Sequence, residues 1–346
     1  MKGPGRLTPQ RVRYSGSMTQ NEIEYRQVGR SGLTVSTVGL GCNNLGRTGT
    51  VTETQEGSDA VVHAALDAGI TLFDVADNYG KTPGLSESIL GRALGAHRAD
   101  VVVATKFGMD VDGANGVDWG RRGSRKYIIQ SVEASLRRLG TDYIDLYQFH
   151  TPDPHTPIAE TISALDDLIR AGKVRYIGHS NRAGWQVAEA EFVARELGAN
   201  RFISSQSHYN LLDRRAELEI TPAAEAFGLG VLPYFPLANG LLTGKYSSGK
   251  APAGSRLSHT RQHMVSDADY GQLQAYGEFA AARGLTELEV AFSWLAAQPS
   301  VASVIAGATK PEQVRQNAVA ASWKPTAEDL AQLDEIFPRT PKVALF

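Results

Sequence analysis

Apolar runs of strand length alternate along the chain with longer segments in which apolar residues recur every three or four positions. The short runs are rich in β-branched residues and are separated by turn residues, which is the pattern of buried β-strands. They occupy 34–42, 71–77, 100–106, 143–150, 174–181, 201–210, 230–236 and 301–307. This alternation predicts a repeated β–α unit.

The segments between these runs have the spacing of amphipathic helices. Two helical faces show it most clearly, and they consist of Ile158, Ile162, Leu165 and Ile169, and of Ile129, Val132, Leu136 and Leu139. Glycines stand where helices would stop before the next strand, the usual position of a helix-terminating glycine, and they are Gly69, Gly140, Gly172 and Gly228. Near the end of the chain, PTAEDL predicts a last helix that opens with a capping box between Thr326 and Asp329.

Strands that are apolar throughout and separated by helices are typical of a parallel sheet covered on both faces. About eight such units in roughly 250 residues or more favour a single (β/α)8 barrel domain. The rival is a doubly wound open sheet, which normally has fewer strands in one domain. A long stretch from Ala238 to about Asp267 interrupts the pattern after the seventh strand, and a connection of this length predicts a functional lid or a disordered insert.

Charge and composition exclude several classes of function. The formal net charge is −2, with acids and bases mixed along the chain, so no basic stripe indicates nucleic acid. No apolar run approaches the ~18 residues of a membrane helix. A single cysteine, Cys42, excludes an internal disulfide framework and suits a reducing compartment, so we expect a cytoplasmic protein. We interpret residues 1–23 as a flexible N-terminal extension and residues 24–346 as the barrel domain.

In such a barrel, chemistry gathers at the C-terminal ends of the strands. The second, third and fourth predicted strands end in Asp74 with Tyr79, in Lys106 and in His150. Taken singly, the aspartate, tyrosine and histidine are explained as turn or rim residues. Lys106 is harder to explain, because an unpaired ammonium at the end of a buried strand is costly. Their joint occurrence on successive strand ends favours a catalytic site.

The four side chains together suit proton transfer at an oxygen atom. A lysine beside Tyr79 favours the phenolate and lowers the tyrosine pKa from its reference of ~10. Asp74 would keep Lys106 charged, and His150 would orient a substrate oxygen. Such a set gives a proton to a carbonyl or removes one from an alcohol. Since no second nucleophile and no metal-binding spacing of His and Cys is visible, a hydride-donating cofactor would complete the reaction.

Evidence for a nucleotide lies at the last two predicted strands. SVIAGATKPEQVRQN ends a strand, adds Thr309 and Lys310, and opens a helix at Pro311, where free N–H groups bind phosphate. Phosphate sites after strands seven and eight recur in barrels. The seventh strand ends in PYFPLANG, with an aromatic able to lie flat on a ring. Lys245 and Arg256 in the long loop could neutralise a pyrophosphate, although solvated surface charge explains both equally well.

The chain resembles the aldo-keto reductase superfamily from about Tyr25 to Phe337. The matching stretches occur in family order and at family spacing, and they are GRSGLTVSTVGLGC, FDVADNYG, VVVATKFG, SLRRLGTDYIDLYQFH, GKVRYIGHSN, YNLLDR, PLANGLLTGKY and GATKPEQVRQN. The resemblance implies a (β/α)8 barrel that binds NADP(H) in an extended form. It also implies that Tyr79 is the general acid/base, Lys106 lowers its pKa, Asp74 anchors Lys106 and His150 orients the carbonyl.

The resemblance assigns cofactor contacts as well. The nicotinamide end would be lined or held by Gly41, Cys42, Asn43, Asp74, Ser180, Asn181, Gln206 and, through stacking, Tyr234. The pyrophosphate would meet Phe235, Pro236, Leu237, Asn239, Lys245 and Arg256. The adenosine and its 2′-phosphate would meet Gly307, Thr309, Lys310, Gln313, Gln316 and Asn317. Phe235 stands where a serine is common in the family, which removes a hydroxyl donor to the pyrophosphate.

The leading hypothesis is therefore an NADPH-dependent reductase of aldehydes or ketones, reversible with alcohols. One alternative makes Lys106 a Schiff-base nucleophile in a barrel lyase or aldolase. Another is a non-catalytic, NADPH-binding regulatory subunit. The expected partner is a small carbonyl or alcohol substrate, with no nucleic acid, membrane or metal.

Overall fold

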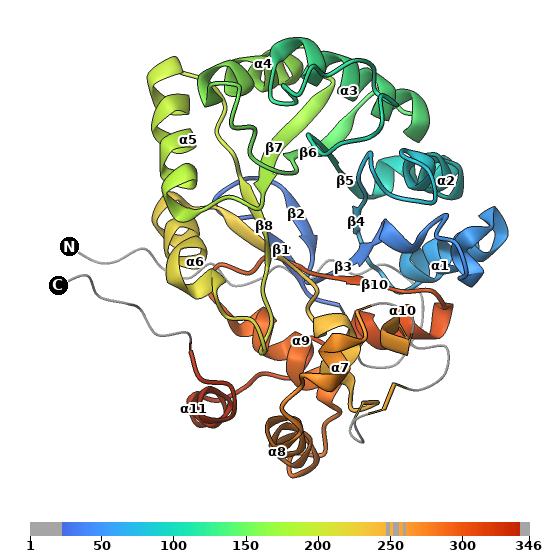
Figure 1. Cartoon of the computed structure of the whole chain (residues 1–346), viewed down its shortest axis with the longest axis vertical. Helices are drawn as coiled ribbons and strands as arrows, with labels where there is room; N and C mark the ends of the chain where they lie inside the picture. The colour runs from blue at the N-terminus through green and yellow to red at the C-terminus, as the bar shows by residue number, and fades with distance from the viewer. Residues whose placement is uncertain (1–22, 247–249, 252–255, 259–260, 340–346) are drawn as a thin grey trace.

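The computed structural model describes residues 23–246, 250–251, 256–258 and 261–339 (Figure 1). The extension predicted for residues 1–23 thus lies, except for Ile23, outside the described residues, and its boundary stays a prediction. Parts of the predicted long loop also lie outside them. Within the described chain, strands and helices alternate from residue 38 to residue 319 as the apolar pattern predicts, except for two additional helices between residues 263 and 281.

The centre of the described structure is an eight-stranded parallel sheet in the order β10-β3-β4-β5-β6-β7-β8-β9. Its strands are β3 (Val38–Gly41), β4 (Leu72–Asp74), β5 (Val102–Phe107), β6 (Ile144–Phe149), β7 (Val174–Ser180), β8 (Ser204–His208), β9 (Gly230–Tyr234) and β10 (Val304–Gly307). The seam between β9 and the segment before β10 is closed by a parallel bridge between Val231 and Val301, in which the Val231 amide donates to the Ser300 carbonyl at 2.7 Å. The predicted (β/α)8 barrel is confirmed.

Helices surround this sheet in chain order (Figure 1). The surrounding helices are α1 (Gln55–Asp67), α2 (Leu85–Leu94), α3 (Arg125–Leu139), α4 (Ile158–Arg170), α5 (Gly184–Leu197), α6 (Ala216–Phe227), α9 (Glu287–Ala297) and α10 (Pro311–Val319). The additional helices are α7 (His263–Ser266), α8 (Tyr270–Ala281) and the C-terminal α11 (Ala327–Ile336). Short 3-10 turns are η1 (Cys42–Asn44), η2 (Val51–Glu53), η3 (Gly95–Asp100), η4 (Ala238–Thr243) and η5 (Arg256–Ser258). No helix in the described ranges is long and apolar enough to cross a membrane.

The predicted helix ends are confirmed in detail. All four terminating glycines have a positive φ, between 64° and 79°, which a residue with a side chain rarely adopts. Thr326 accepts from the Asp329 amide at 3.1 Å, and the Asp329 carboxylate accepts from the Thr326 amide at 2.7 Å, so the capping box is present. One face was assigned wrongly: Ile128 of α3 is buried, whereas Ile129 is 43% exposed.

The segment 34–42 is not one strand, as its apolar pattern predicts, but two. β2 (Thr34–Ser36) pairs antiparallel with β1 (Tyr25–Gln27), and the barrel strand begins only at Val38. The hairpin packs its apolar residues against the inward-facing side chains one layer below the polar strand ends. This contact comprises Val28, Leu33, Val35, Leu72, Ala104, Leu146 and Leu232. The N-terminal end of the barrel is therefore closed by an apolar plug.

Glycine is required where this plug meets the barrel. Gly29 has φ +59°, and a Cβ on it would lie 2.3 Å from the Gly228 carbonyl oxygen. The adjacent Arg30 amide donates to that same carbonyl at 2.9 Å. The hairpin thus contacts the backbone of the turn between α6 and β9.

Candidate active site

Successive side chains of a strand point to opposite faces, so the polar residues of the barrel strands form an inner set and an outer set. On β5, Thr105 contacts a helix outside the barrel, while its neighbour Lys106 contacts Asp74 of β4 inside. Leu72 and Ala104 line the plug, and the inward positions two residues later are Asp74 and Lys106. The inner face of the barrel therefore changes from apolar to charged within one layer.

Lys106 and Asp74 form a buried ion pair. Lys106 Nζ lies 2.8 Å from Asp74 Oδ2 and donates to the Val75 carbonyl at 2.8 Å, and neither residue is more than 3% exposed. Burial lowers the pKa of Lys106, but Asp74 and Tyr79 together outweigh burial through charge and hydrogen bonding, and the net pKa is raised. The ammonium therefore stays charged.

Two glutamines complete the shell of Asp74. Its Oδ1 accepts from Gln206 Nε2 at 2.8 Å and from Gln148 Nε2 at 3.3 Å. Gln206 was predicted to contact a cofactor, and in the structure its amide nitrogen is directed at the aspartate. Gln148 was missed by the sequence analysis. Its signal was a polar residue inside an apolar strand, two positions before His150 and so on the same face.

Tyr79 lies at the end of the turn that follows β4. Lys106 Nζ is 5.0 Å from the centroid of the Tyr79 ring. Burial raises the pKa of Tyr79 more than the Lys106 charge lowers it, so the net pKa lies above its ordinary value. The predicted effect of Lys106 is present, since its charge lowers the Tyr79 pKa, but burial outweighs it, and the sequence does not reveal that burial. In this state Tyr79 is a protonated acid beside a fixed cation.

His150 follows β6 and contacts Tyr79 edge to face, with ring centroids 6.1 Å apart. It is 7% exposed, and its Nδ1 has no hydrogen-bond partner among the described residues. Burial, reinforced by the Lys106 charge, lowers the pKa of His150 to about 3. The imidazole is therefore neutral at physiological pH. The four predicted residues, Asp74, Tyr79, Lys106 and His150, are brought together and are called the tetrad below.

Asn181 connects three strand ends around the tetrad. Its Nδ2 donates to the His150 carbonyl at 2.9 Å, and its Oδ1 accepts from the Tyr234 hydroxyl at 2.8 Å. The neighbouring Ser180 hydroxyl donates to the Gln206 carbonyl at 2.8 Å. Each side-chain amide atom of Asn181 keeps capacity for one further hydrogen bond. Four of the predicted nicotinamide contacts, Ser180, Asn181, Gln206 and Tyr234, thus lie together, but they are already bonded to one another or to His150.

Tyr234 is partly exposed, and its ring stacks on His208 with centroids 5.5 Å apart and an interplanar angle of 11°. Stacking on a flat ligand ring would use the opposite face. His208 was also missed by the sequence analysis, although it ends its strand as Tyr234 ends the next one. It contacts Asp213 through Nδ1 at 3.1 Å.

The segment after β9 has an unusual backbone. Phe235, Ala238 and Asn239 have φ values of 53°, 46° and 59°, which are uncommon for residues with side chains. Asn239 is 9% exposed and its Oδ1 has no partner among the described residues. Of the other predicted pyrophosphate contacts, Pro236 and Leu237 lie in this segment and Lys245 is exposed beside it. Arg256 begins η5, and its side chain lies outside what the structure describes.

The predicted adenosine contacts follow β10. Gly307 ends the strand, and a Cβ on it would lie 2.9 Å from Asn44 Nδ2, beside the strand end that holds Gly41, Cys42 and Asn43. The Thr309 amide donates a hydrogen bond to Gln313 Oε1 at 2.8 Å, so the Gln313 side chain already has a backbone partner at the start of α10. Lys310 and Gln316 are exposed and Asn317 is buried. Pro311 is the first residue of α10, as predicted.

This arrangement matches a known family. The model of the aldo/keto reductase family matches residues 37–337. The chain is 38% identical over 322 residues to the uncharacterized oxidoreductase YrpG of Bacillus subtilis (strain 168), covering 91% of this chain and 96% of that protein. It is 34% identical over 328 residues to an L-glyceraldehyde 3-phosphate reductase of Escherichia coli (strain K12), covering 91% and 92%.

A further relative has a different kind of name. The chain is 36% identical over 332 residues to a probable voltage-gated potassium channel subunit beta of Oryza sativa subsp. japonica, covering 92% of this chain and 98% of that protein. The family match extends over most of the chain and includes every strand of the barrel. The chain belongs to the aldo/keto reductase family and is an oxidoreductase that acts on carbonyl and alcohol groups.

Proposed function

We propose that the protein reduces an aldehyde or ketone to the alcohol, reversibly, with NADPH as hydride donor and Tyr79 as the general acid. The observation that carries the proposal is the buried Lys106–Asp74 pair, with Lys106 Nζ 5.0 Å from the centroid of the Tyr79 ring, beside a neutral His150. A protonated phenol, a fixed cation and a neutral imidazole together can activate a carbonyl oxygen.

Tyr79 donates its proton to the carbonyl oxygen as negative charge develops there. The resulting phenolate is stabilised by the Lys106 ammonium, which cannot move away because Asp74 and the Val75 carbonyl hold it. Because burial raises the pKa of Tyr79, the proton is present at neutral pH at the start of reduction. In the reverse direction Lys106 is the group that makes a phenolate accessible.

His150 acts in its neutral form. A ring nitrogen that carries a hydrogen can donate to the substrate oxygen and hold the carbonyl near Tyr79. Since the pKa of His150 is lowered to about 3, it does not become a competing cation at physiological pH.

The residues at the mouth fit a nicotinamide nucleotide, which would supply the hydride when bound. Unpartnered buried atoms on Gln148, His150 and Asn239 offer hydrogen-bonding capacity within the described residues. Ser180, Asn181 and Gln206 would hold the carboxamide, and Tyr234 would stack on the ring. Lys245 and Arg256 would meet the pyrophosphate, and Thr309 with Lys310 would meet the 2′-phosphate, which is the basis for proposing NADPH rather than NADH.

Two alternatives are less well supported. A Schiff-base lysine must lose its proton, whereas Lys106 is held as an ammonium by Asp74 and has a raised pKa. A regulatory subunit without turnover needs no such proton-transfer set. A cytoplasmic location and a small-molecule partner complete the proposal, based on the single buried cysteine and on the tetrad.

The test is Tyr79→Phe, assayed by NADPH absorbance against a panel of aldehydes and ketones. We expect turnover to fall by about 10²–10⁴-fold, while the dissociation constant for NADPH, measured by fluorescence, changes less than about threefold. Tyr25→Phe is the matched control, because Tyr25 lies in the N-terminal hairpin and its hydroxyl donates to the Gly69 carbonyl, away from the tetrad. Full activity in Tyr79→Phe refutes the mechanism. Borohydride trapping of substrate on Lys106 would favour the Schiff-base alternative.

A further inference from the structure

A second buried polar cluster lies behind the turn that carries Tyr79. It joins Asp77 of that turn, Asn115 of the loop after β5, Arg138 of α3, Glu87 of α2 and Thr105 of β5. Asp77, Glu87 and Thr105 are 0% exposed. Nothing in the sequence gives Asp77 a role in the site, so its complete burial needs an explanation.

The cluster is connected by a continuous series of hydrogen bonds. Asn115 Nδ2 donates to Asp77 Oδ2 at 2.8 Å, and Asn115 Oδ1 accepts from Arg138 at 2.9 Å. Arg138 Nε then donates to Glu87 Oε2 at 2.6 Å, and Thr105 donates to Glu87 Oε1 at 2.6 Å. Two helices, one strand and one loop are thereby attached to the Asp77 carboxyl. We call this set the outer cluster.

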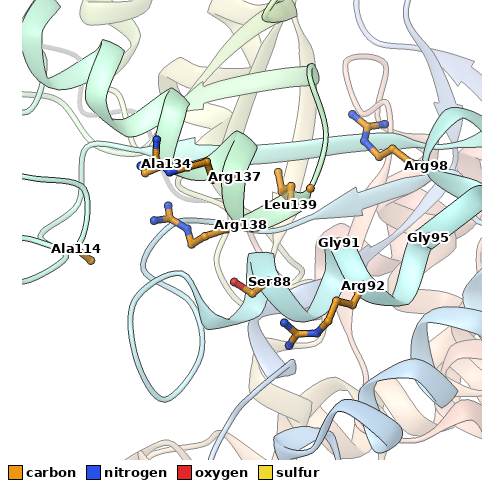
Figure 2. Close-up of a pocket in the computed structure, with 11 residues that line it drawn as sticks. Ser88, Gly91, Arg92, Gly95, Arg98, Ala114, Ala134, Arg137, Arg138 and Leu139 are labelled. Carbon is orange, nitrogen blue, oxygen red and sulfur yellow. The ribbon is translucent and has the colours of Figure 1, made fainter.

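Arg138 connects the outer cluster to a cleft at the surface. It lines a cleft of about 550 Å³ between α2 and α3, together with Ser88 and Ala114 (Figure 2). Its stem passes closely over Gly84, where a Cβ would lie 2.4 Å from Arg138 Cδ. The position of the guanidinium is therefore fixed from both sides, by the backbone of Gly84 and by the carboxylate of Glu87.

The same turn is attached to the tetrad strand. The Val75 amide donates to the Ala104 carbonyl at 2.8 Å, and the Asp77 amide donates to the Lys106 carbonyl at 3.3 Å. Tyr79 follows two residues later, and its amide donates a hydrogen bond to the Ala76 carbonyl at 3.2 Å. Any shift of Asp77 is thus transmitted over two residues to the Tyr79 ring.

We propose that Asp77 is a positioning residue, whose hydrogen bond to Asn115 holds the turn so that the Tyr79 hydroxyl stays beside Lys106. The proposal rests on the proposed function only in giving Tyr79 its role as acid. Asp77 does not touch the reacting atoms. It acts through the backbone of its turn, and the outer cluster supplies the rigid support.

The electrostatics of Asp77 support this assignment. Burial and the nearby Glu87 raise the pKa of Asp77 well above its usual range, although Arg138 and Asn115 act in the opposite direction. Lys106 itself pairs directly with Asp74 and not with Asp77. We expect asparagine to replace Asp77, because its amide oxygen can still accept from Asn115 Nδ2.

The experiment compares Asp77→Ala, Asp77→Asn and Asn115→Ala in the full chain. We expect Asp77→Ala and Asn115→Ala each to lower kcat by about 10–100-fold, with KM and the NADPH dissociation constant changed less than about threefold. Asp77→Asn should keep kcat within about threefold of the parent. The double alanine variant should be no worse than either single variant, because both remove the same contact.

Thr326→Ala is the stability control, since it removes a helix cap on α11 and lowers Tm by about 2 °C without reaching the site. A kcat in Asp77→Ala within threefold of the parent overturns the proposal. So does an asparagine variant as impaired as the alanine variant. A kcat loss that follows only the folded fraction, as in Thr326→Ala, also overturns it.

A readout without turnover separates this proposal from the proposed function. Crystal structures of the parent and of Asp77→Ala should show the Tyr79 hydroxyl displaced from Lys106 Nζ in the variant. An unchanged Tyr79 position overturns the positioning role even if the protein reduces carbonyls. A displaced Tyr79 in a protein whose parent shows no carbonyl reduction supports the positioning role and refutes the proposed function.

Discussion

Two buried ion pairs lie on opposite faces of β5. Inside the barrel, Lys106 pairs with Asp74, and outside it, Arg138 pairs with Glu87 next to Thr105. Lys106 is fully buried, whereas the Arg138 side chain is 17% exposed. Both pairs take charges out of water, so both require good geometry.

The two pairs differ in whether the cation can still act on another neighbour after pairing. Arg138 uses Nε and both terminal nitrogens on Glu87, Asn115 and Ser135, as suits a rigid guanidinium fork. Lys106 is a compact point charge that is held by Asp74 and Val75 and still faces the Tyr79 ring at 5.0 Å. The hydrogen bonds of Arg138 thus all serve the packing of the structure. Lys106, in contrast, still faces Tyr79, whose hydroxyl can gain or lose a proton.

Removing the inner cation should have the greatest effect. Lys106→Met should lower kcat by about 10²–10⁴-fold, because the Tyr79 phenolate loses its stabilising charge. It should also cost about 3–5 kcal/mol of unfolding free energy, since Asp74 is left as a buried, unpaired charge. Steady-state kinetics and urea unfolding measure the two effects. Retention of kcat within tenfold would contradict the role given to the inner pair.

Arg138→Met is the matched change on the outer face. Breaking this pair leaves Glu87 buried without its cation and should cost a similar 3–5 kcal/mol in urea unfolding. The folded enzyme should nevertheless keep a kcat at least about tenfold above that of Lys106→Met, because Tyr79 retains its cation. Equal loss of kcat in the two variants would show that the two pairs do not divide structure and chemistry between them.

The dependence of stability on pH tests the protonation state of His150 on the inner side. Unfolded His150 binds a proton near its ordinary pKa of 6.5, whereas the folded residue stays neutral down to about 3. The unfolded state therefore gains protons first as pH falls, and stability should decrease by about 1.4 kcal/mol per pH unit between these values. The measurement is the difference in urea unfolding between the parent and His150→Gln from pH 7 to pH 4. A pH-independent difference would mean that His150 titrates normally.

The smallest expected effect comes from the neighbour of Lys106 on the outer face. Thr105→Val keeps the shape of the side chain but removes the donor to Glu87 Oε1, which should cost about 1–3 kcal/mol. We expect kcat to stay within about threefold of the parent. Thermal unfolding and steady-state kinetics on one preparation test both expectations. A large loss of kcat at unchanged stability would place chemistry on the outer face as well.

The sequence predicted the inner pair but not the outer one. Lys106 and Asp74 ended apolar runs, so their charges stood out against buried neighbours. Glu87 and Arg138 lie within amphipathic helices, where a charged residue normally indicates an exposed face. Nothing in their spacing reveals that they meet, because their contact depends on how α2 and α3 pack. Asp77 likewise has no role that the sequence reveals, since burial of a turn follows from the loop that covers it.

Local chemistry explains the other successes and errors. Helix-ending glycines and the Thr326 capping box were predictable because they depend on nearby backbone groups. The split of 34–42 into two strands was not, because β-branched residues continue across Thr37 and the division arises from pairing with β1. The face of α3 shifted by one residue because Ile128 and Ile129 are both apolar, so only the packed structure distinguishes them.

The apolar hairpin at the base of the barrel also bears on how the chain is made. Its residues Val28, Leu33 and Val35 emerge from the ribosome early, but the backbone that receives Gly29 lies at Gly228. At 5–20 residues per second, roughly 200 residues take about 10–40 s to synthesise. Throughout that time the hairpin has no barrel to close, and its apolar side chains must be shielded by other means. A segment that is synthesised before every strand of the barrel is thus among the last to reach its native contacts.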